Sequence, residues 1–167
     1  MKFIISLIAI LLFGGNELMA QKVYSGKAEM SYLFFQDHLV KYDLIEGNEI
    51  NILDGNAVEI ASSHGFKINQ LLYAGIGLAY FKGSGNDYLG WYFDFDLFLS
   101  QKKVRPIIGV VLGNDYQLNK QHSSSFRFDF TGGVAFNLTS KNAITLKSGI
   151  AMRQQSSFIP VKLGFTF

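Results

Sequence analysis

The chain of 167 residues has no cysteine, only two prolines and few charged residues. Without cysteine it forms no disulfide, no thiolate metal site and no cysteine nucleophile, and it carries no lipid-anchored amino-terminal cysteine. Charged residues make up 17% of the chain, whereas an average soluble domain has about 25%. The formal net charge is only +2. Nucleic-acid-binding proteins carry strongly basic patches, so we expect no nucleic-acid partner.

Apolar residues, by contrast, are abundant. The chain is 49% hydrophobic and 15% aromatic, and its mean hydropathy is +0.18. Intrinsic disorder needs low hydrophobicity and high net charge, so this composition predicts a folded chain. The length fits one domain.

The amino-terminal segment has the pattern of a targeting sequence. Lys2 precedes an apolar run over 3–13 that only Ser6 interrupts, and Ala20 is a small residue before the expected cut. This order is typical of a secretory signal peptide. A membrane-spanning helix needs about 20 apolar residues, which excludes an anchoring helix here. We therefore predict a signal peptide over 1–20 and one exported domain over 21–167.

The rest of the chain alternates between apolar and polar positions, which is the period of a β-strand. Between 125 and 138, the even positions carry large apolar side chains such as Phe126, Phe128 and Phe130, whereas the odd positions carry Arg127, Asp129 and small residues. Seven further stretches follow the same rule. The eight predicted strands are 27–35, 57–68, 71–81, 88–99, 104–116, 125–138, 143–153 and 159–167.

These strands are long, and the connections between them differ in length. Strands in globular proteins average about 5–6 residues, whereas a tilted strand that crosses a membrane needs about 9–11. Short connections alternate with longer ones, as expected for periplasmic turns and extracellular loops. The pattern predicts an all-β fold, an eight-stranded antiparallel up-and-down transmembrane β-barrel. Residues 37–56 form its long extracellular loop or a projecting hairpin.

Alternation alone does not say which face of the barrel meets solvent. A soluble lipocalin-like barrel, which binds a ligand, has its apolar face inside. Eight continuous faces of large apolar side chains would overfill the interior of an eight-stranded barrel. The polar face is rich in small residues rather than in the Lys and Glu of a soluble surface. These points favour apolar side chains toward lipid and polar side chains in the lumen.

Charges inside such a barrel must be paired, because an isolated buried charge is very costly. Neighbouring strands offer three pairings: Asp94 or Asp96 with Arg105, Arg127 or Asp129 with Lys147, and Lys162 with Glu29 across the closing seam. We interpret the set as a structural ion-pair network that plugs the lumen, in preference to an ion-conducting channel. The predicted inward charges are Glu29, Glu59, Asp94, Asp96, Arg105, Asp115, Arg127, Asp129, Lys147, Arg153 and Lys162.

Aromatic residues gather near the predicted strand ends, where they suit the girdles that membrane barrels carry at both interfaces. We assign Tyr80, Tyr88, Tyr116, Phe126 and Phe158 to the outer girdle and Phe66, Tyr73 and Phe98 to the inner one.

Three stretches carry a resemblance to a known family. The segments 65–80, Lys102–Pro106 and Phe158–Phe167 resemble small outer-membrane β-barrel-domain proteins of the OmpA/OmpX-like type, common in Bacteroidota. The resemblance covers about residues 57–167. It implies that the terminal Phe167 belongs to the signal read by the barrel-assembly machinery, and that the protein lies in the outer membrane of a Gram-negative bacterium.

An enzymatic role has weaker support. Some similar barrels modify lipid A with a His, a Ser and an acid near the outer rim, and here His122-Ser123-Ser124 follows Asp115 in the sequence. His beside Ser in a loop is common, and no phosphate loop, paired-carboxylate motif or metal-binding His spacing occurs. The acidic residues of 37–54 do not have calcium-loop spacing. We expect no enzyme activity, no cofactor and no metal.

The sequence thus predicts a monomeric outer-membrane barrel that contacts membrane lipids or lipopolysaccharide and has a structural or surface-interaction role through its outer loops. The alternatives are a narrow pore, a lipid A-modifying enzyme and the soluble lipocalin-like barrel. The sequence does not identify an extracellular partner.

Overall fold

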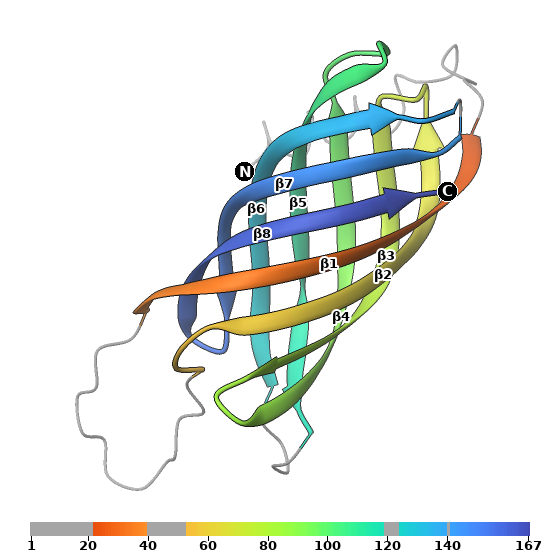
Figure 1. Ribbon diagram of the computed structural model, residues 1–167. Coiled ribbons are helices and arrows are strands. Elements are labelled where there is room, and N and C mark those ends of the chain that lie inside the picture. The colour runs from red at the N-terminus through yellow and green to blue at the C-terminus, as the bar shows by residue number, and fades with distance from the viewer. Residues whose placement is uncertain (1–21, 40–52, 119–123, 140) are drawn as a thin grey trace, which may run out of the picture.

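The computed structural model describes residues 22–39, 53–118, 124–139 and 141–167. Eight antiparallel strands follow one another around a closed barrel, and β1 pairs with β8 to close it (Figure 1). This confirms the predicted all-β, eight-stranded up-and-down barrel. The strands are β1 (Lys22–His38), β2 (Ala57–Ile68), β3 (Leu72–Gly83), β4 (Asn86–Phe98), β5 (Val104–Gln117), β6 (Ser124–Asn137), β7 (Ala143–Arg153) and β8 (Ser156–Thr166).

The two faces of the barrel wall follow the alternation of the sequence. In β4, Asp94 and Asp96 are buried, whereas their neighbours Phe93, Phe95 and Leu97 point outward. The large apolar side chains on the outer surface are between 37% and 62% exposed. Soluble monomers rarely expose apolar patches larger than a few hundred Å². The apolar face is therefore outside, and the soluble lipocalin-like alternative is wrong.

The two ends of the barrel are built differently. We call the end that holds the start of β1, the carboxyl-terminal Phe167 and the connections 69–71, 99–103 and 138–142 the terminal end. The opposite end, the loop end, holds the β1–β2, β3–β4, β5–β6 and β7–β8 connections. At the loop end, Ser84 and Gly85 form a two-residue turn with φ of 50° and 76°. Positive φ at both positions suits the twist of a tight hairpin.

Several predicted boundaries shift in the structure. Strand β1 runs on to His38, so the first residues of the predicted loop 37–56 are strand, and Asp37 opposes Ser157 of β8. The connection left between the predicted strands 71–81 and 88–99 shortens to the turn at Ser84 and Gly85, because both flanking strands continue their pairing up to that turn. The predicted signal peptide 1–20, residues 40–52 of the long loop and residues 119–123 lie outside the described residues.

Buried aromatic side chains close the lumen near both ends. Toward the loop end, Phe81 and Tyr88 stack with their ring centroids 4.5 Å apart, and Phe158 packs in the same cluster. Toward the terminal end, Tyr73 and Phe98 form a second cluster. The girdle assignment is therefore wrong for Tyr73, Tyr88, Phe98 and Phe158, which point inward. Each lies on the same face of its strand as the small or charged residues. The alternation along the strand therefore decides that these side chains point inward, although they lie near the rim.

Glycine allows two strands to approach closely at the β6–β7 pairing. A Cβ atom on Gly133 would collide with the carbonyl oxygen of Leu146 and lie 2.8 Å from the Cα of Lys147. The adjacent Gly132 faces outward, and a Cβ there meets nothing within 4 Å. Glycine kinks of this kind allow a strongly curved sheet to close.

This contrast generates a test of barrel closure. We expect Gly133→Ala to lower the free energy of unfolding by about 1–3 kcal/mol, the usual cost of overpacking. Gly132→Ala, the matched control, is expected to leave stability unchanged or slightly raised, because alanine restricts the unfolded chain. Urea unfolding in lipid vesicles measures both, with the fluorescence of the single, outward-facing Trp91 as the reporter. Equal midpoints for the two variants would contradict the close approach.

Candidate functional site, the charged lumen

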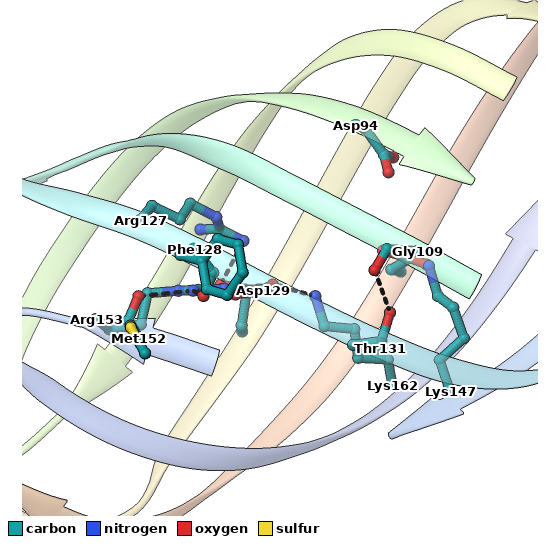
Figure 2. Close-up of polar contacts among 12 residues, drawn as sticks. Asp94, Gly109, Arg127, Phe128, Asp129, Thr131, Lys147, Met152, Arg153 and Lys162 are labelled. Atoms are coloured by element: carbon teal, nitrogen blue, oxygen red, sulfur yellow. Dashed lines mark hydrogen bonds and ion pairs between the residues drawn. The ribbon is translucent and has the colours of Figure 1, made fainter. Parts of the chain in front are cut away.

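The lumen toward the loop end holds six charged side chains, which we call the loop-side cluster. Arg153 of β7 donates two hydrogen bonds to the Asp129 carboxylate of β6, one of them 2.8 Å long from Nη2 to Oδ2 (Figure 2). Lys162 Nζ lies 2.6 Å from the same Oδ2. Asp129 thus binds two cations, and the fork of Arg153 gives the strong bidentate geometry. The members are Glu59, Asp115, Arg127, Asp129, Arg153 and Lys162.

Arg127 links the remaining acids of this cluster. Its Nη2 lies 2.8 Å from Oε2 of Glu59, and its Nη1 lies 3.2 Å from Oδ1 of Asp115. Arg153 Nη2 also reaches Glu59 Oε2 at 3.5 Å. The Arg127 guanidinium lies over the ring of Tyr92, 4.7 Å from its centroid. Three carboxylates and three cations make this cluster electrically neutral.

A second group, the terminal-side cluster, lies farther along the lumen and comprises Lys27, Glu29, Asp94, Asp96 and Lys147. Lys27 Nζ is 2.6 Å from a carboxylate oxygen of both Asp94 and Asp96. Lys147 Nζ is 2.6 Å from Glu29 Oε1 and 3.4 Å from Asp96 Oδ1. This cluster has one more carboxylate than it has cations.

Neutral polar groups complete the terminal-side cluster. Ser63 Oγ donates to Asp94 Oδ2 at 2.7 Å and lies 2.9 Å from the hydroxyl of Tyr73. Lys27 Nζ is 5.0 Å from the centroid of the Tyr73 ring. Ser63 therefore adds a hydrogen bond to Asp94, whose ion-pair partner Lys27 also binds Asp96.

The charges of both clusters are between 0% and 5% exposed. Taking ions out of water is so costly that burial requires a close partner for each. Because seven strands contribute charged members, the ion pairs tie the walls of the barrel together across its interior.

The structure places ten of the eleven predicted inward charges within these two clusters. Glu29, Asp94, Asp96 and Lys147 are in the terminal-side cluster; Glu59, Asp115, Arg127, Asp129, Arg153 and Lys162 are in the loop-side cluster. Arg105 is in neither. Its Nη1 donates to the carbonyl oxygen of Gln70 at 3.2 Å, and its guanidinium lies 4.3 Å from the centroid of Phe98.

The predicted partners are wrong. Asp96 pairs with Lys27 rather than with Arg105, Lys147 pairs with Glu29 and Asp96, and Lys162 pairs with Asp129. These ion pairs join strands that are not neighbours in the sheet, such as β1 with β4 and β6 with β8. The physical reason is the narrow interior, which brings long inward side chains of non-neighbouring strands within reach of one another.

The sequence reasoning also missed Lys27 and Lys67 as inward charges. Lys27 stands at the first position of the predicted strand 27–35, where a lysine is normally solvated. In the structure β1 begins at Lys22, so Lys27 lies well inside the barrel and is 2% exposed. The sequence does contain a sign of this, because Lys27 lies two residues before Glu29 and therefore on the same inward face of the strand.

The other sequence candidates have no assembled site in the described chain. His122 and Ser123 lie outside the described residues, and Asp115 is engaged by Arg127. No cluster of metal-binding side chains occurs within the described ranges. The described residues also include no helix long and apolar enough to cross a membrane.

Comparison with solved structures identifies the architecture. Neisserial surface protein A matches with a TM-score of 0.55 and 13% identity, covering 86% of this chain and 95% of that one. The amino-terminal barrel of Pseudomonas aeruginosa OprF matches with a TM-score of 0.54 and 11% identity, covering 88% and 100%. The chain has the fold of the small transmembrane β-barrels. The outer membrane protein OprG of the same organism also matches, with a TM-score of 0.51 and 8% identity, covering 89% of this chain and 98% of that one.

These identities are low, so the likeness concerns the fold. No protein-family model and no curated protein matches the sequence.

The ion pairs generate a second prediction. Asp129→Asn leaves Arg153 and Lys162 without their shared carboxylate, and loss of one partner in a buried pair costs about 3–5 kcal/mol. We expect the free energy of unfolding to fall by that amount. Asp87→Asn is the control, because Asp87 and Lys82 form a more exposed pair at 3.7 Å, which is worth about 1 kcal/mol or less. Urea unfolding in vesicles measures both, and similar losses would contradict a stabilising network in the lumen.

Proposed function

We propose that the protein is an integral outer-membrane β-barrel with a sealed lumen, which has a structural or surface-interaction role through its loop end. The observation that carries this proposal is the separation of the two faces, with apolar side chains outside and ion pairs inside. Only a lipid environment accommodates such an outer surface without exposing it to water.

Location and partners follow from the same surface. The targeting pattern of residues 1–20 and the fold shared with barrels of the Gram-negative outer membrane support export to that membrane. Outer-membrane lipids, including lipopolysaccharide, contact the apolar band. The closed sheet leaves no edge strand with which a second copy could pair, which supports the proposal of a monomer.

Phe167 acts as part of the assembly signal. Its backbone exchanges two hydrogen bonds with Gly26 of β1, 2.9 Å and 2.8 Å long, at the seam that closes the barrel. Its side chain is 47% exposed on the outside. This outward side chain at the seam supports a role for Phe167 in recognition by the barrel-assembly machinery.

The sealed lumen is favoured over a pore. The charged side chains at its middle, among them Glu59, Asp129 and Arg153, are fully buried. A continuous water-filled path would expose the side chains that line it. The aromatic clusters toward both ends narrow the interior further.

The absence of cysteine gives a direct test of location and orientation. Asp54→Cys places a thiol on an exposed side chain at the loop end, and Lys102→Cys places one on an exposed turn at the terminal end. A membrane-impermeant maleimide is expected to label the first variant on intact cells and the second only after the outer membrane is permeabilised. The reverse pattern would invert the orientation. Labelling of a soluble periplasmic species would overturn the outer-membrane location.

Electrical recording tests the sealed lumen. Purified protein in planar bilayers is expected to give no resolved single-channel steps, because the ion pairs leave no aqueous path. A shift in gel mobility on boiling provides the control that folded barrel was added. Reproducible conductance steps from folded protein would instead support the narrow pore.

A further inference from the structure

Two cations at the terminal end of the lumen have no acidic partner within the part of the chain that the structure describes. Lys67 of β2 is 9% exposed and Arg105 of β5 is 3% exposed. They lie 5.8 Å and 4.3 Å from the centroid of the Phe98 ring. Arg105 donates to the Gln70 carbonyl, and its buried Nε has no hydrogen-bond partner.

The surrounding charges do not cancel these two cations. The nearest acid cluster is the terminal-side cluster, where Asp96 is already bound by Lys27 and Lys147. That cluster has a single excess negative charge, which is too little to balance the two positive charges of Lys67 and Arg105. The three connections of the terminal end, 69–71, 99–103 and 138–142, add Lys102, Lys103 and Lys141 and contain no Asp or Glu. Even with the α-carboxylate of Phe167, whose residue lines the cavity described below, these residues leave this end of the barrel with a net positive charge.

A cavity of about 610 Å³ opens at the same place. Lys67 lines it from the lumen, and Lys141 lines it from the β6–β7 connection. The side-chain amides of Asn69 and Gln101 come from two other connections, and Phe167 forms part of the apolar wall. Arg105 does not line the cavity, but it donates to the carbonyl oxygen of Gln70, which does, and it adds positive potential.

We propose that this cavity is an anion-binding site for a phosphate group, carried either by a phospholipid headgroup or by a free phosphorylated solute. Two ammonium groups and two amides offer more donors than a carboxylate accepts, whereas a phosphate group presents three strong acceptor oxygens. Lys67 is the direct ligand, and its lack of a carboxylate partner leaves its charge available. Arg105 is a positioning residue.

Binding by the full-length folded protein in a phosphate-free maltoside detergent tests the site. One arm titrates inorganic phosphate and follows binding by calorimetry. The second adds phosphatidylglycerol and follows its retention by native mass spectrometry. We expect Lys67→Gln to weaken binding about tenfold or more, as loss of a hydrogen bond to a charged group does. Lys103→Gln, which removes a charge from the same end outside the cavity, is expected to bind like the unmodified protein.

The two arms separate the sources of the phosphate. Binding of both probes indicates a site for the group itself, whereas binding of only one identifies a solute or a headgroup. Boiling shifts on gels report whether each variant folds. Lys141→Gln changes an exposed turn residue that also lines the cavity, and we expect it to weaken binding as well. It provides the test if Lys67→Gln does not fold. The absence of binding in both arms, or an equal loss in Lys103→Gln, would overturn the proposal.

Discussion

The interior of an eight-stranded barrel is just wide enough for side chains, and the rest of this structure depends on that limit. Long strands with an apolar outer face require a closed sheet, because an open edge in lipid would leave backbone groups unsatisfied. Closure at eight strands then compels every inward side chain to share one narrow space. Small residues such as Gly133 allow neighbouring strands to approach, and charged residues such as Asp129 must find partners there without water.

The same limit explains the arrangement of the charges. Lys27 on β1 reaches Asp96 on β4, and Lys162 on β8 reaches Asp129 on β6, because the narrow lumen brings inward side chains of strands that are not neighbours in the sheet within reach of one another. Arginine is well suited to such a space, since its planar fork binds a carboxylate at two points. Aromatic layers toward both ends separate the ion pairs from solvent. Lys67 and Arg105 lie outside this arrangement, beside a cavity that opens at the terminal end.

The strand pattern was predictable wherever alternation was strong. Leu89, Trp91 and Phe93 alternate with small and polar residues clearly enough to fix which face of β4 is outside. Prediction failed where position along a strand was taken as stronger evidence than parity. Tyr88 and Phe158 were assigned to an interfacial girdle because they lie near strand ends, although their parity matches the inward faces. Lys27 was overlooked because the start of β1 has no strong alternation to mark it.

By itself, the sequence determined the number of strands, their approximate bounds, their two faces and the requirement that inward charges be paired, because each of these follows from local periodicity. The partners were decided only by the tertiary structure. Strand tilt and closure determine which inward residues lie at the same height across the lumen, and no local pattern records that height. Arg105 illustrates the difference: its inward face was predictable, but only the closed barrel placed it over Phe98 and away from Asp96.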